Sequence, residues 1–261
     1  MEKSTVIGVV LGFSAVGFGM ALKGASMSVL INPAAFLIII AGTAACLFNG
    51  FPMEQLKPFP SLVKELFKKK ELVSKTELLP LFVELSQTAR REGILALESR
   101  VEEIRDPFLK NGLSMVIDGL DPEFVGDVLD AEIESMEERH RNGVLIFSQA
   151  GTYAPTLGVL GAVVGLIAAL GNLDDIEKLG HSIAAAFVAT LLGIFTGYVI
   201  WHPFANKLKL LSKKEAEIKK MMIEGILSLQ AGDSPTAIEA KLLVFIPLKE
   251  RAQLKPKTEE P

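Results

Sequence analysis

The pattern of hydrophobic and charged positions divides the chain into four apolar runs and two charged stretches. The apolar runs cover about residues 4–22, 30–50, 143–170 and 182–201. Each reaches the ~20 residues that an α-helix, rising about 1.5 Å per residue, needs to cross ~30 Å of hydrocarbon. The sequence therefore predicts an all-α membrane protein with four transmembrane helices.

Turn signals and composition divide the predicted protein into four parts. Asn32 and Pro33 predict the start of the second membrane helix, because asparagine caps helices and proline favours the first helical position. The cluster Asn-Gly-Phe-Pro at 49–52 predicts its end. We assign residues 1–51 to a first transmembrane hairpin, 52–142 to a large helical cytoplasmic domain between the second and third spans, 143–202 to a second transmembrane hairpin, and 203–261 to a cytoplasmic helical tail.

Basic residues predict which side of the membrane each part faces. Of the 27 lysines and arginines, only Lys23 and Lys178 fall in the two short turns that join paired spans. Since basic residues stay cytoplasmic, both termini and segment 52–142 are expected inside the cell. The first run is also long enough for a signal peptide. Glu2 weakens the positive start that such a peptide needs, and a second span follows at once, so a transmembrane helix is favoured.

Segment 52–142 has the three- and four-residue apolar spacing that is typical of helices. The stripe consists of Leu78, Leu81, Phe82, Leu85, Ala89, Ile94, Leu97, Val101 and Ile104. Pro80 is expected in the first turn of this helix, after a cap at Ser74 or Thr76. Arg90 and Glu98 are eight residues apart, so we expect both on one face of a continuous helix. A solvated charged face is the simplest interpretation of that pair.

Two membrane helices are expected to continue beyond the bilayer. From Pro122 an apolar spacing runs through the charged stretch 137–141 into the third span without a strong breaker. The fourth span continues past Pro203 in the same way. Breaks are expected at Asp106-Pro107 and Asp121-Pro122, because each places a capping aspartate ahead of a proline.

The interiors of the four predicted spans contain no aspartate, glutamate, lysine or arginine. An ion pump or transporter normally needs an ionisable group there, and each charge at the bilayer centre costs about 2.5–3.5 kcal/mol to insert. Either this chain conducts nothing, or another subunit supplies the carboxylate. The sequence shows no nucleophile–base pair and no phosphate loop, so we expect neither an enzyme nor a cofactor. The net charge of −4 argues against nucleic acid as a partner, and the single cysteine, Cys46, argues against a metal site.

Small residues line both helices of the second hairpin at three- and four-residue spacing. They are Gly158, Gly161 (or Ala162), Gly165, Ala168 and Ala169 in the third span, and Ala186, Ala189 (or Thr190), Gly193 and Gly197 in the fourth. Such stripes let backbones approach closely, either to hold this chain's own helices together or to offer a close surface to a partner helix. Thr190, near the middle of its span, either back-bonds to its own helix or faces a polar partner. Pro155, between Tyr153 and Thr156, predicts a kink or hinge.

Five stretches of the chain carry a recognisable order of motifs. They are ARREGILALE at 89–98, APTLGVLGAVVGL at 154–166, AFVATLLG at 186–193, HPFANKL at 202–208 and IEGILSLQAGDSP at 223–235. Each motif is weak alone, but their order and the four-span topology together are specific. In these features the chain resembles the MotA/PomA family of bacterial flagellar stator proteins, which is related to ExbB and TolQ. The resemblance covers nearly the whole chain.

The resemblance implies a function and a set of partners. Family members lie in the bacterial inner membrane, where five copies surround the transmembrane helices of a MotB dimer. MotB brings the membrane aspartate that this chain lacks, and the complex couples ion flow to torque on the flagellar rotor protein FliG. Ala162 stands where sodium-driven relatives tend to carry threonine, which favours H+ as the transported ion, with Na+ as the alternative.

The resemblance also implies roles for single residues. Arg90 and Glu98 match the family's torque-generating charges, which meet charged residues of FliG. Pro155 and Pro203 match its functional prolines, and Thr190 matches a threonine near the MotB aspartate. The expected ion path and partner-helix interface consists of Tyr153, Pro155, Thr156, Ala162 and Thr190.

One alternative within the same class is an ExbB/TolQ-like energiser, which also surrounds a carboxylate-bearing helix but powers outer-membrane processes. Those proteins usually have three spans and lack the first hairpin expected here. A passive membrane scaffold, or a membrane enzyme without ion flow, is an alternative from a different class, and the sequence supplies no nucleophile–base pair or phosphate loop for such an enzyme.

Overall fold

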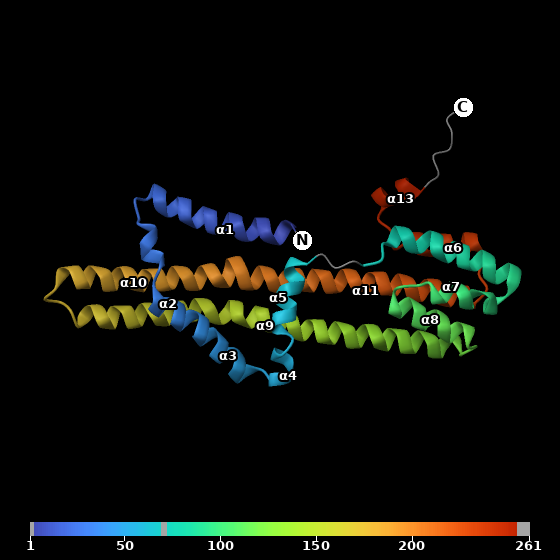
Figure 1. Cartoon of the computed structure of the whole chain (residues 1–261), viewed down its shortest axis with the longest axis horizontal. Helices are drawn as coiled ribbons and strands as arrows, with labels where there is room; N and C mark the ends of the chain where they lie inside the picture. The colour runs from blue at the N-terminus through green and yellow to red at the C-terminus, as the bar shows by residue number, and fades with distance from the viewer. Residues whose placement is uncertain (1–2, 69–71, 255–261) are drawn as a thin grey trace, which may run out of the picture. The chain divides into compact units, whose positions relative to one another are not determined.

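The computed structural model describes residues 3–68 and 72–254, and every regular element within them is helical (Figure 1). These residues form two compact units. The membrane unit comprises residues 3–68 and 139–210, and the charged unit comprises residues 72–138 and 211–254. Two long helices, α9 (Pro122–Leu170) and α11 (His202–Gln230), contribute to both units. The all-α prediction is confirmed, and so are the predicted continuous helix from Pro122 through the third span and the continuation beyond Pro203.

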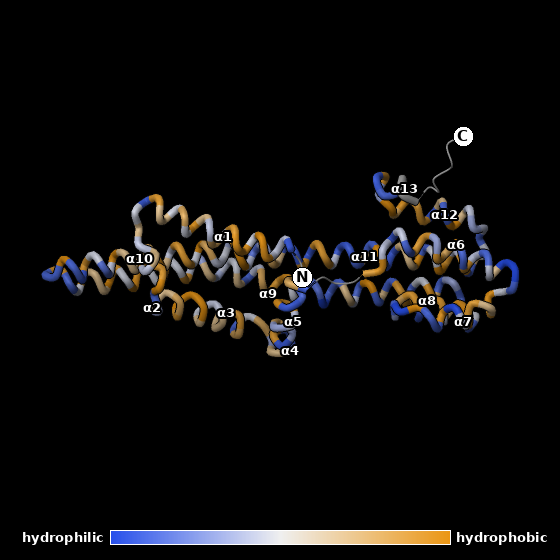
Figure 2. The backbone as a smooth tube through the Cα atoms, turned by 45° about the horizontal axis from the view of Figure 1, so that its top comes forward, coloured by the Kyte–Doolittle hydropathy of each residue, from blue (hydrophilic) through white to orange (hydrophobic). Residues whose placement is uncertain are grey.

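Four helical stretches of the described chain are long and apolar enough to cross a membrane, as predicted. The first is α1 (Lys3–Leu22). The second follows the short 3-10 helix η1 (Met27–Leu30) and combines α2 (Pro33–Phe36), the π-helix η2 (Leu37–Ala41) and α3 (Gly42–Gly50). The third is the later part of α9, and the fourth is α10 (Ile176–Phe195) with the π-helix η4 (Thr196–Trp201). Figure 2 shows these stretches mostly in orange and white.

The ends of the second span lie where the sequence predicts them. The Asn32 side-chain oxygen accepts a hydrogen bond from the Ala35 N–H at 3.1 Å, and Pro33 is the first helical residue. The helix ends at Gly50, and Phe51 is already extended. Asn32 therefore caps the helix by satisfying an N–H that has no partner within the first turn.

Aromatic side chains hold the short helices α4 (Met53–Leu56) and α5 (Phe59–Phe67) within the membrane unit. The ring of Phe59 stacks on Phe147 at a centroid distance of 5.1 Å, and Phe147 meets Trp201 at 6.0 Å. By contrast, α1 fully buries only Thr5 and Gly17, and much of its apolar surface is exposed. A helix so exposed and so apolar is typical of contact with lipid or with another apolar surface.

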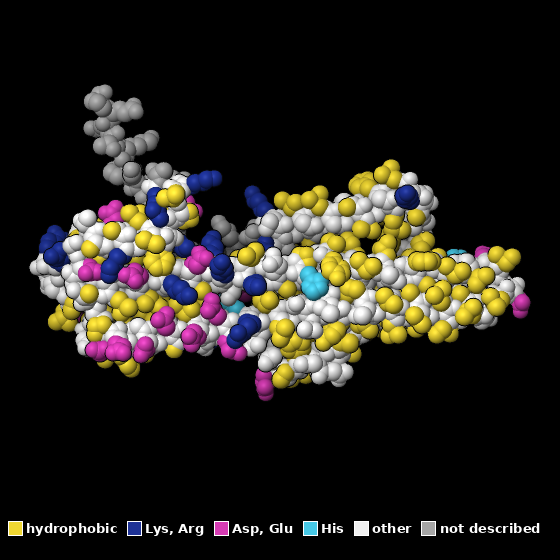
Figure 3. Space-filling model, turned by 180° about the vertical axis from the view of Figure 1, so that it is seen from behind, with side chains coloured by type: hydrophobic (Ala, Val, Ile, Leu, Met, Phe, Trp, Pro, Cys, Tyr) yellow, Lys and Arg dark blue, Asp and Glu magenta, His cyan; other side chains and the backbone are white. Residues whose placement is uncertain are grey.

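The charged unit has a conventional core of large apolar side chains. It contains α6 (Lys75–Glu92), the 3-10 helix η3 (Ile94–Leu97), α7 (Glu98–Glu102), α8 (Pro107–Ile117), α12 (Pro235–Leu243) and α13 (Leu248–Leu254), with parts of α9 and α11. Phe82, Phe108, Leu129 and Ile226 are fully buried in one cluster. Figure 3 shows lysine, arginine, aspartate and glutamate gathered over this unit, and mostly hydrophobic side chains over the membrane unit.

Two predicted helix starts are confirmed in the charged unit, and one detail is wrong. Asp106 caps α8 by accepting the Leu109 N–H at 3.0 Å. Ser74 caps α6, and the Glu77 carboxylate reaches back to the Ser74 N–H at 3.4 Å to complete a capping box. Because this box fixes Lys75 as the first helical residue, Pro80 lies in the second turn of α6 and not in the first. The proline therefore costs the helix one backbone hydrogen bond, which a proline in the first turn would not have cost.

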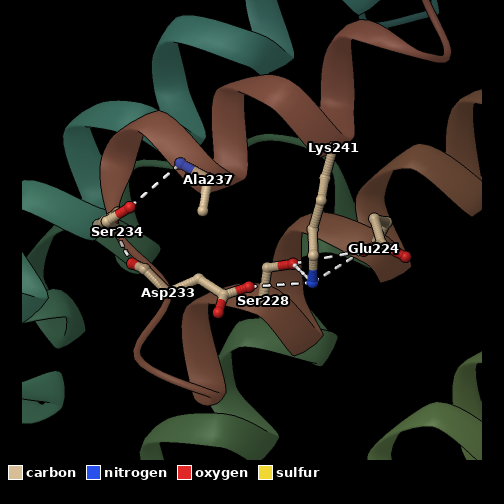
Figure 4. Close-up of polar contacts among 7 residues, drawn as sticks. Glu224, Ser228, Asp233, Ser234, Ala237 and Lys241 are labelled. Carbon is tan, nitrogen blue, oxygen red and sulfur yellow. Dashed lines mark hydrogen bonds and ion pairs between the residues drawn. The ribbon is translucent and has the colours of Figure 1, made fainter.

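A cluster of charges fastens the C-terminal part of the charged unit. The Lys241 ammonium lies 2.9 Å from a carboxylate oxygen of Asp233 and 3.3 Å from one of Glu224, and it donates to the buried Ser228 hydroxyl at 3.0 Å (Figure 4). The Lys241 hydrogen bond holds the pKa of the Asp233 carboxyl below its ordinary value of 3.8. The same bond, followed by the one to Glu224, raises the pKa of Lys241. Helix α12 is thus tied to α11 by groups that are charged at neutral pH.

Candidate functional site

The later part of α9 and α10 meet through their backbones. A Cβ atom added at Gly158 would lie 2.8 Å from the Ala189 carbonyl oxygen and 2.9 Å from the Gly193 Cα. A Cβ added at Gly193 would lie 2.7 Å from the Ala154 carbonyl oxygen and 2.8 Å from the Gly158 Cα. Real Cβ atoms essentially never come this close to backbone atoms. Each glycine therefore occupies the space that a side chain on the other would need.

The small residues of α9 and α10 pack against each other within this chain, which is one of the two arrangements that the sequence allows. Gly165 packs on Ala186, and Gly161 packs on Ala189, so the stripe glycines of α9 face the stripe residues of α10 within this chain. The expectation that these glycines offer a surface to a partner helix is wrong for Gly158, Gly161, Gly165 and Gly193. Apolar side chains occupy the exposed faces instead, with Ile167 65% exposed on α9 and Phe187 71% exposed on α10.

Pro155 lies inside α9, beside Gly197 of η4. Its ring packs against Gly197, where an added Cβ would meet Pro155 Cγ at 2.7 Å and the Gly151 carbonyl oxygen at 2.8 Å. Proline has no N–H, so the Gly151 carbonyl loses its ordinary partner four residues on. Gly197 lets η4 approach this freed carbonyl at the position where the sequence predicts a hinge.

The remaining predicted ion-path residues differ in exposure and partners. The Thr156 hydroxyl is exposed and donates to the carbonyls of Thr152 at 3.0 Å and Tyr153 at 2.9 Å. Thr190 is half-buried, and its hydroxyl lies 3.5 Å from the Ala186 carbonyl, at the long limit of a hydrogen bond. Ala162 is half-buried beside the packed glycines. The Thr190 hydroxyl thus makes only a long hydrogen bond to its own helix.

Tyr153 faces a different neighbour from Thr190. Its ring packs with a small cluster around Leu47 and Ile146, and its hydroxyl lies near Gly50 of the second span. Tyr153 therefore contacts the first transmembrane hairpin of the same chain. Thr190 lies instead on α10, which packs against α9. The structure does not bring these two predicted site residues together.

Pro203, the other predicted hinge, follows directly after the π-helix η4 and the first residue of α11. In a regular α-helix the Pro203 ring would clash with the carbonyl four residues earlier, and the wider π turn relieves that clash. The Thr196 hydroxyl donates to the carbonyls of Leu192 at 2.8 Å and Gly193 at 3.2 Å, where the helix changes type. The sequence signals the proline but not the π-helix that precedes it.

The two charges expected to meet a rotor lie on different elements. Helix α6 ends at Glu92, Gly93 adopts φ +88° and ψ 163°, and η3 leads into α7, whose first residue is Glu98. The expectation of one continuous helical face for Arg90 and Glu98 is therefore wrong. The Gly93 conformation is almost restricted to glycine, so this residue forces the break. Ile94, Leu97 and Val101 nevertheless pack on the same core, which is why the apolar spacing seemed to continue.

The segment between these charges is a largely exposed turn that a buried leucine and an ion pair anchor to the rest of the unit. Arg90 and Glu98 are both exposed, and Leu95 between them is 69% exposed. Leu97 is fully buried, and Arg100 forms an ion pair with Glu84 of α6. We call segment 90–98 the charged turn, which is largely exposed apart from the buried Leu97. Its side chains are available to a partner, while its base is anchored to the unit.

Two protein families match the chain. Residues 6–93 match the Motility protein A N-terminal family, and residues 100–221 match the MotA/TolQ/ExbB proton channel family. Motility protein A of Bacillus subtilis (strain 168) is 57% identical over 251 residues, which are 96% of this chain and 93% of that protein. The chain belongs to the MotA family of flagellar stator proteins.

Other MotA-family proteins match over almost the same length. Chemotaxis protein PomA of Vibrio alginolyticus is 31% identical over 97% of this chain and 98% of PomA. The structure of the flagellar MotAB stator complex from Bacillus subtilis matches with a TM-score of 0.93 and 55% identity, over 98% of this chain and 100% of that one. The C. jejuni MotAB structure matches with a TM-score of 0.90 and 33% identity, over 95% and 97% of the two chains. The chain is thus a stator-type subunit with the MotA fold.

Proposed function

We propose that this subunit works with a MotB-type partner to couple ion flow across the bacterial inner membrane to rotation of the flagellar motor. The observation that carries the proposal is the combination of charge-free spans with family membership. An ion path through this family's subunits needs a carboxylate, and the interiors of these spans contain no aspartate, glutamate, lysine or arginine. A partner helix would supply the missing group.

The exposed apolar faces of the membrane unit support a helical partner. Ile167 on α9, Phe187 on α10 and Tyr198 on η4 are each at least 64% exposed. Apolar faces of this kind are typical of contact with lipid or with another membrane helix. We propose that five copies surround a MotB dimer, and that Thr190 turns its weakly held hydroxyl toward the partner's aspartate. Tyr153, Pro155, Thr156 and Ala162 would shape the same path, and Pro155 and Pro203 would let it change shape.

The charged turn is the proposed contact with the rotor protein FliG. Arg90 and Glu98 present opposite charges, and both side chains are exposed. An exposed ion pair contributes only about 0–1 kcal/mol, so such contacts can form and break at each step. One elementary charge crossing 100 mV supplies about 2.3 kcal/mol, which exceeds that contribution. We place both termini and the charged unit in the cytoplasm, where a rotor contact requires them.

A proton-leak measurement tests the partner requirement. Cells would express this chain alone, with a MotB-like partner that lacks its plug, or with the same partner carrying asparagine in place of its membrane aspartate. We expect rapid acidification of the cytoplasm only with the unmodified carboxylate. Equal leak with and without the partner would show that the carboxylate does not come from it.

The transported ion is tested separately. Ala162 favours H+ over Na+ in the family comparison, so swimming speed in a strain that depends on this chain should follow the proton gradient. We expect the speed to stay constant when external sodium is varied at fixed pH. A speed that rises with sodium would assign Na+ instead.

The ExbB/TolQ alternative is disfavoured, because the Motility protein A N-terminal family matches residues 6–93 and so covers the first hairpin.

A further inference from the structure

Hydroxyl side chains follow one face of α9 around Pro155. Ser148, Thr152 and Thr156 are four residues apart, so they share a face of the helix. The exposed Thr152 hydroxyl donates to the Ser148 carbonyl at 3.1 Å, and the exposed Thr156 hydroxyl donates to the Thr152 carbonyl at 3.0 Å. Because these protons are used within the helix, both hydroxyls present lone pairs that accept hydrogen bonds from water.

A tyrosine and a histidine lie on the facing helix. Tyr198 is 64% exposed, and its ring centroid lies 5.3 Å from that of the half-buried His202. Helices α9 and η4 meet where a Cβ added at Gly197 would lie 2.8 Å from the Gly151 carbonyl oxygen. In two antiparallel right-handed helices, the residues that follow such a contact turn to the same side, so Thr152 and Tyr198 share one side of the hairpin. We call the polar residues of that side the polar track: Ser148, Thr152, Thr156, Tyr198 and His202.

His202 lies at the end of the polar track, directly after the fourth apolar run. A Cβ added at Gly151 would lie 2.8 Å from the Cγ, Cδ2 and Nδ1 atoms of His202, so the ring fills the space that a side chain there would need. Within residues 3–68 and 72–254, no hydrogen bond or ion pair uses this ring. Packing therefore fixes the ring, and its nitrogen atoms remain for water.

The groups around His202 leave it as the proton carrier of the polar track. On its own helix, the titratable group that contacts the ring is Tyr198. On α9, Gly151 and its hydroxyl-bearing neighbours do not titrate, and the Tyr153 hydroxyl lies near Gly50 instead. Histidine is the side chain that ordinarily gains and loses its proton between pH 5 and 8.

We propose that His202 transfers protons at the cytoplasmic end of the ion path, an inference that rests on the proposed motor function. Water held by the hydroxyls of Thr152 and Thr156 carries the proton that the partner's aspartate releases. The imidazole accepts that proton at one nitrogen and then releases a proton to cytoplasmic water. Each passage therefore returns the ring to its neutral form.

Proton flow in inverted membrane vesicles, which expose the cytoplasmic face, tests the proposal. The vesicles contain the full chain with a MotB-like partner that lacks its plug, and an acidic interior drives protons outward. His202→Gln should slow the flow about tenfold. This is less than the usual contribution of a positioned acid–base group, about 10²–10⁴-fold, because water can replace part of it. His202→Ala should be equally slow, and imidazole added outside should restore its flow.

A pH series separates proton transfer from a structural role of the ring. When the pH is lowered on both sides at a constant difference, the wild-type rate should fall as the ring becomes protonated, because a protonated imidazole accepts no proton. His202→Gln should remove that fall. His181→Gln is the matched control, since His181 is an exposed histidine at the other end of the same span, and it should leave the rate unchanged.

The outcomes distinguish this proposal from the motor function on which it rests. An unchanged rate in His202→Gln, no recovery of His202→Ala with imidazole, or an equal loss in His181→Gln would each overturn the role of His202 alone. Imidazole should not raise the rate of vesicles whose partner carries asparagine in place of its aspartate. If wild-type vesicles are no faster than those asparagine vesicles, the proposed motor function is wrong and the role of His202 is wrong with it.

Discussion

The two units of this protein pack their helices in opposite ways, one through close backbone contact and the other through large buried side chains. In the membrane unit, α9 and α10 approach through Gly158 and Gly193, and their contact consists largely of backbone atoms. In the charged unit, Gly225 of α11 accommodates the whole ring of Phe82, which is fully buried. A glycine serves both contacts, but one brings backbone to backbone and the other makes room for a large side chain.

The difference follows from the solvent around each unit. In water, burial of a large apolar side chain supplies the main stabilising free energy. Lipid tails are as apolar as leucine, so burial between membrane helices gains little, and close van der Waals contact must supply the attraction. The units should therefore fail differently: the charged unit when a large side chain is removed, and the membrane unit when a small one is added.

The largest loss of stability is expected from Phe82→Ala in the charged unit. Removing a fully buried phenylalanine ring leaves a cavity and should cost about 3–5 kcal/mol. Thermal unfolding of the purified complex, followed by circular dichroism, measures the effect. Leu95→Ala serves as the control, since Leu95 is 69% exposed and its truncation should shift the transition very little. A similar loss in both variants would contradict the assignment of the core.

A comparable substitution in the opposite direction tests the membrane unit. Gly193→Val adds atoms where even a Cβ would lie 2.7 Å from the Ala154 carbonyl oxygen, and such overpacking typically costs about 1–3 kcal/mol. The fraction of protein that remains monodisperse in detergent after heating should fall. Gly19→Ala is the control, because no atom lies within 4 Å of the added Cβ. If both glycine variants behave alike, the close contact is not what holds α9 and α10 together.

Gly93→Ala is expected to disturb the charged turn with a smaller effect on the rest of the unit. Alanine at φ +88° and ψ 163° is strained by about 1–3 kcal/mol, although no neighbouring atom blocks its Cβ. Part of that strain should be relieved by a shift of the turn, so swimming torque should fall more than thermal stability does. Glu92→Ala, at the exposed end of α6, provides the comparison. Unchanged torque together with unchanged stability would show that the turn adopts another conformation.

The C-terminal charge cluster predicts a dependence of stability on pH. The pKa of Asp233 is lowered in the folded state, so its stabilising contribution is present above about pH 4 and is lost as the pH falls through the folded value. The raised pKa of Lys241 adds a contribution that is present at neutral pH and is lost only at strongly alkaline pH. Asp233→Asn should lower the unfolding temperature slightly at pH 7 and reduce its decline below pH 4. A wild-type and variant difference that does not change with pH would argue against the ion pair.

The smallest effect on the fold is expected from charge reversal in the charged turn. Arg90→Glu and Glu98→Lys change exposed side chains, so stability should stay within about 0.5 kcal/mol of wild type. Motility in a strain that depends on this chain should nevertheless be impaired. Membrane levels of the protein are measured alongside swimming, and normal swimming of the double variant would remove these two residues from the proposed rotor contact.

The sequence predicts the parts of this fold that depend on local chemistry. The four spans follow from length and apolar composition, and the caps at Asn32 and Asp106 follow from side chains that satisfy nearby N–H groups. Apolar periodicity alone could not show the break at Gly93, because Leu97 and Val101 keep facing the same core after the chain changes direction. A signal was present: arginines in a last helical turn followed by glycine are typical of a helix end.

The candidate site could be predicted only in part. Proline positions and the missing carboxylate are visible in the sequence. The direction in which a small-residue stripe faces is not, because the same spacing serves contacts within and between chains. The π-helix η2 in the second span has no proline beside it, and nothing in its residues explains it.

The mutual fit of Gly158 and Gly193 also limits how this protein can change over generations. Each position is blocked by the backbone of the other helix, so exchange of one glycine does not make room for exchange of the second. Residues in contact usually diverge through compensating pairs of mutations. Such a pair is not available at these two glycines. A larger residue at either position would require α9 and α10 to move apart, and that displacement has to occur in a single step. The contact therefore keeps both positions glycine as the sequence diverges, whether or not these residues take part in moving ions.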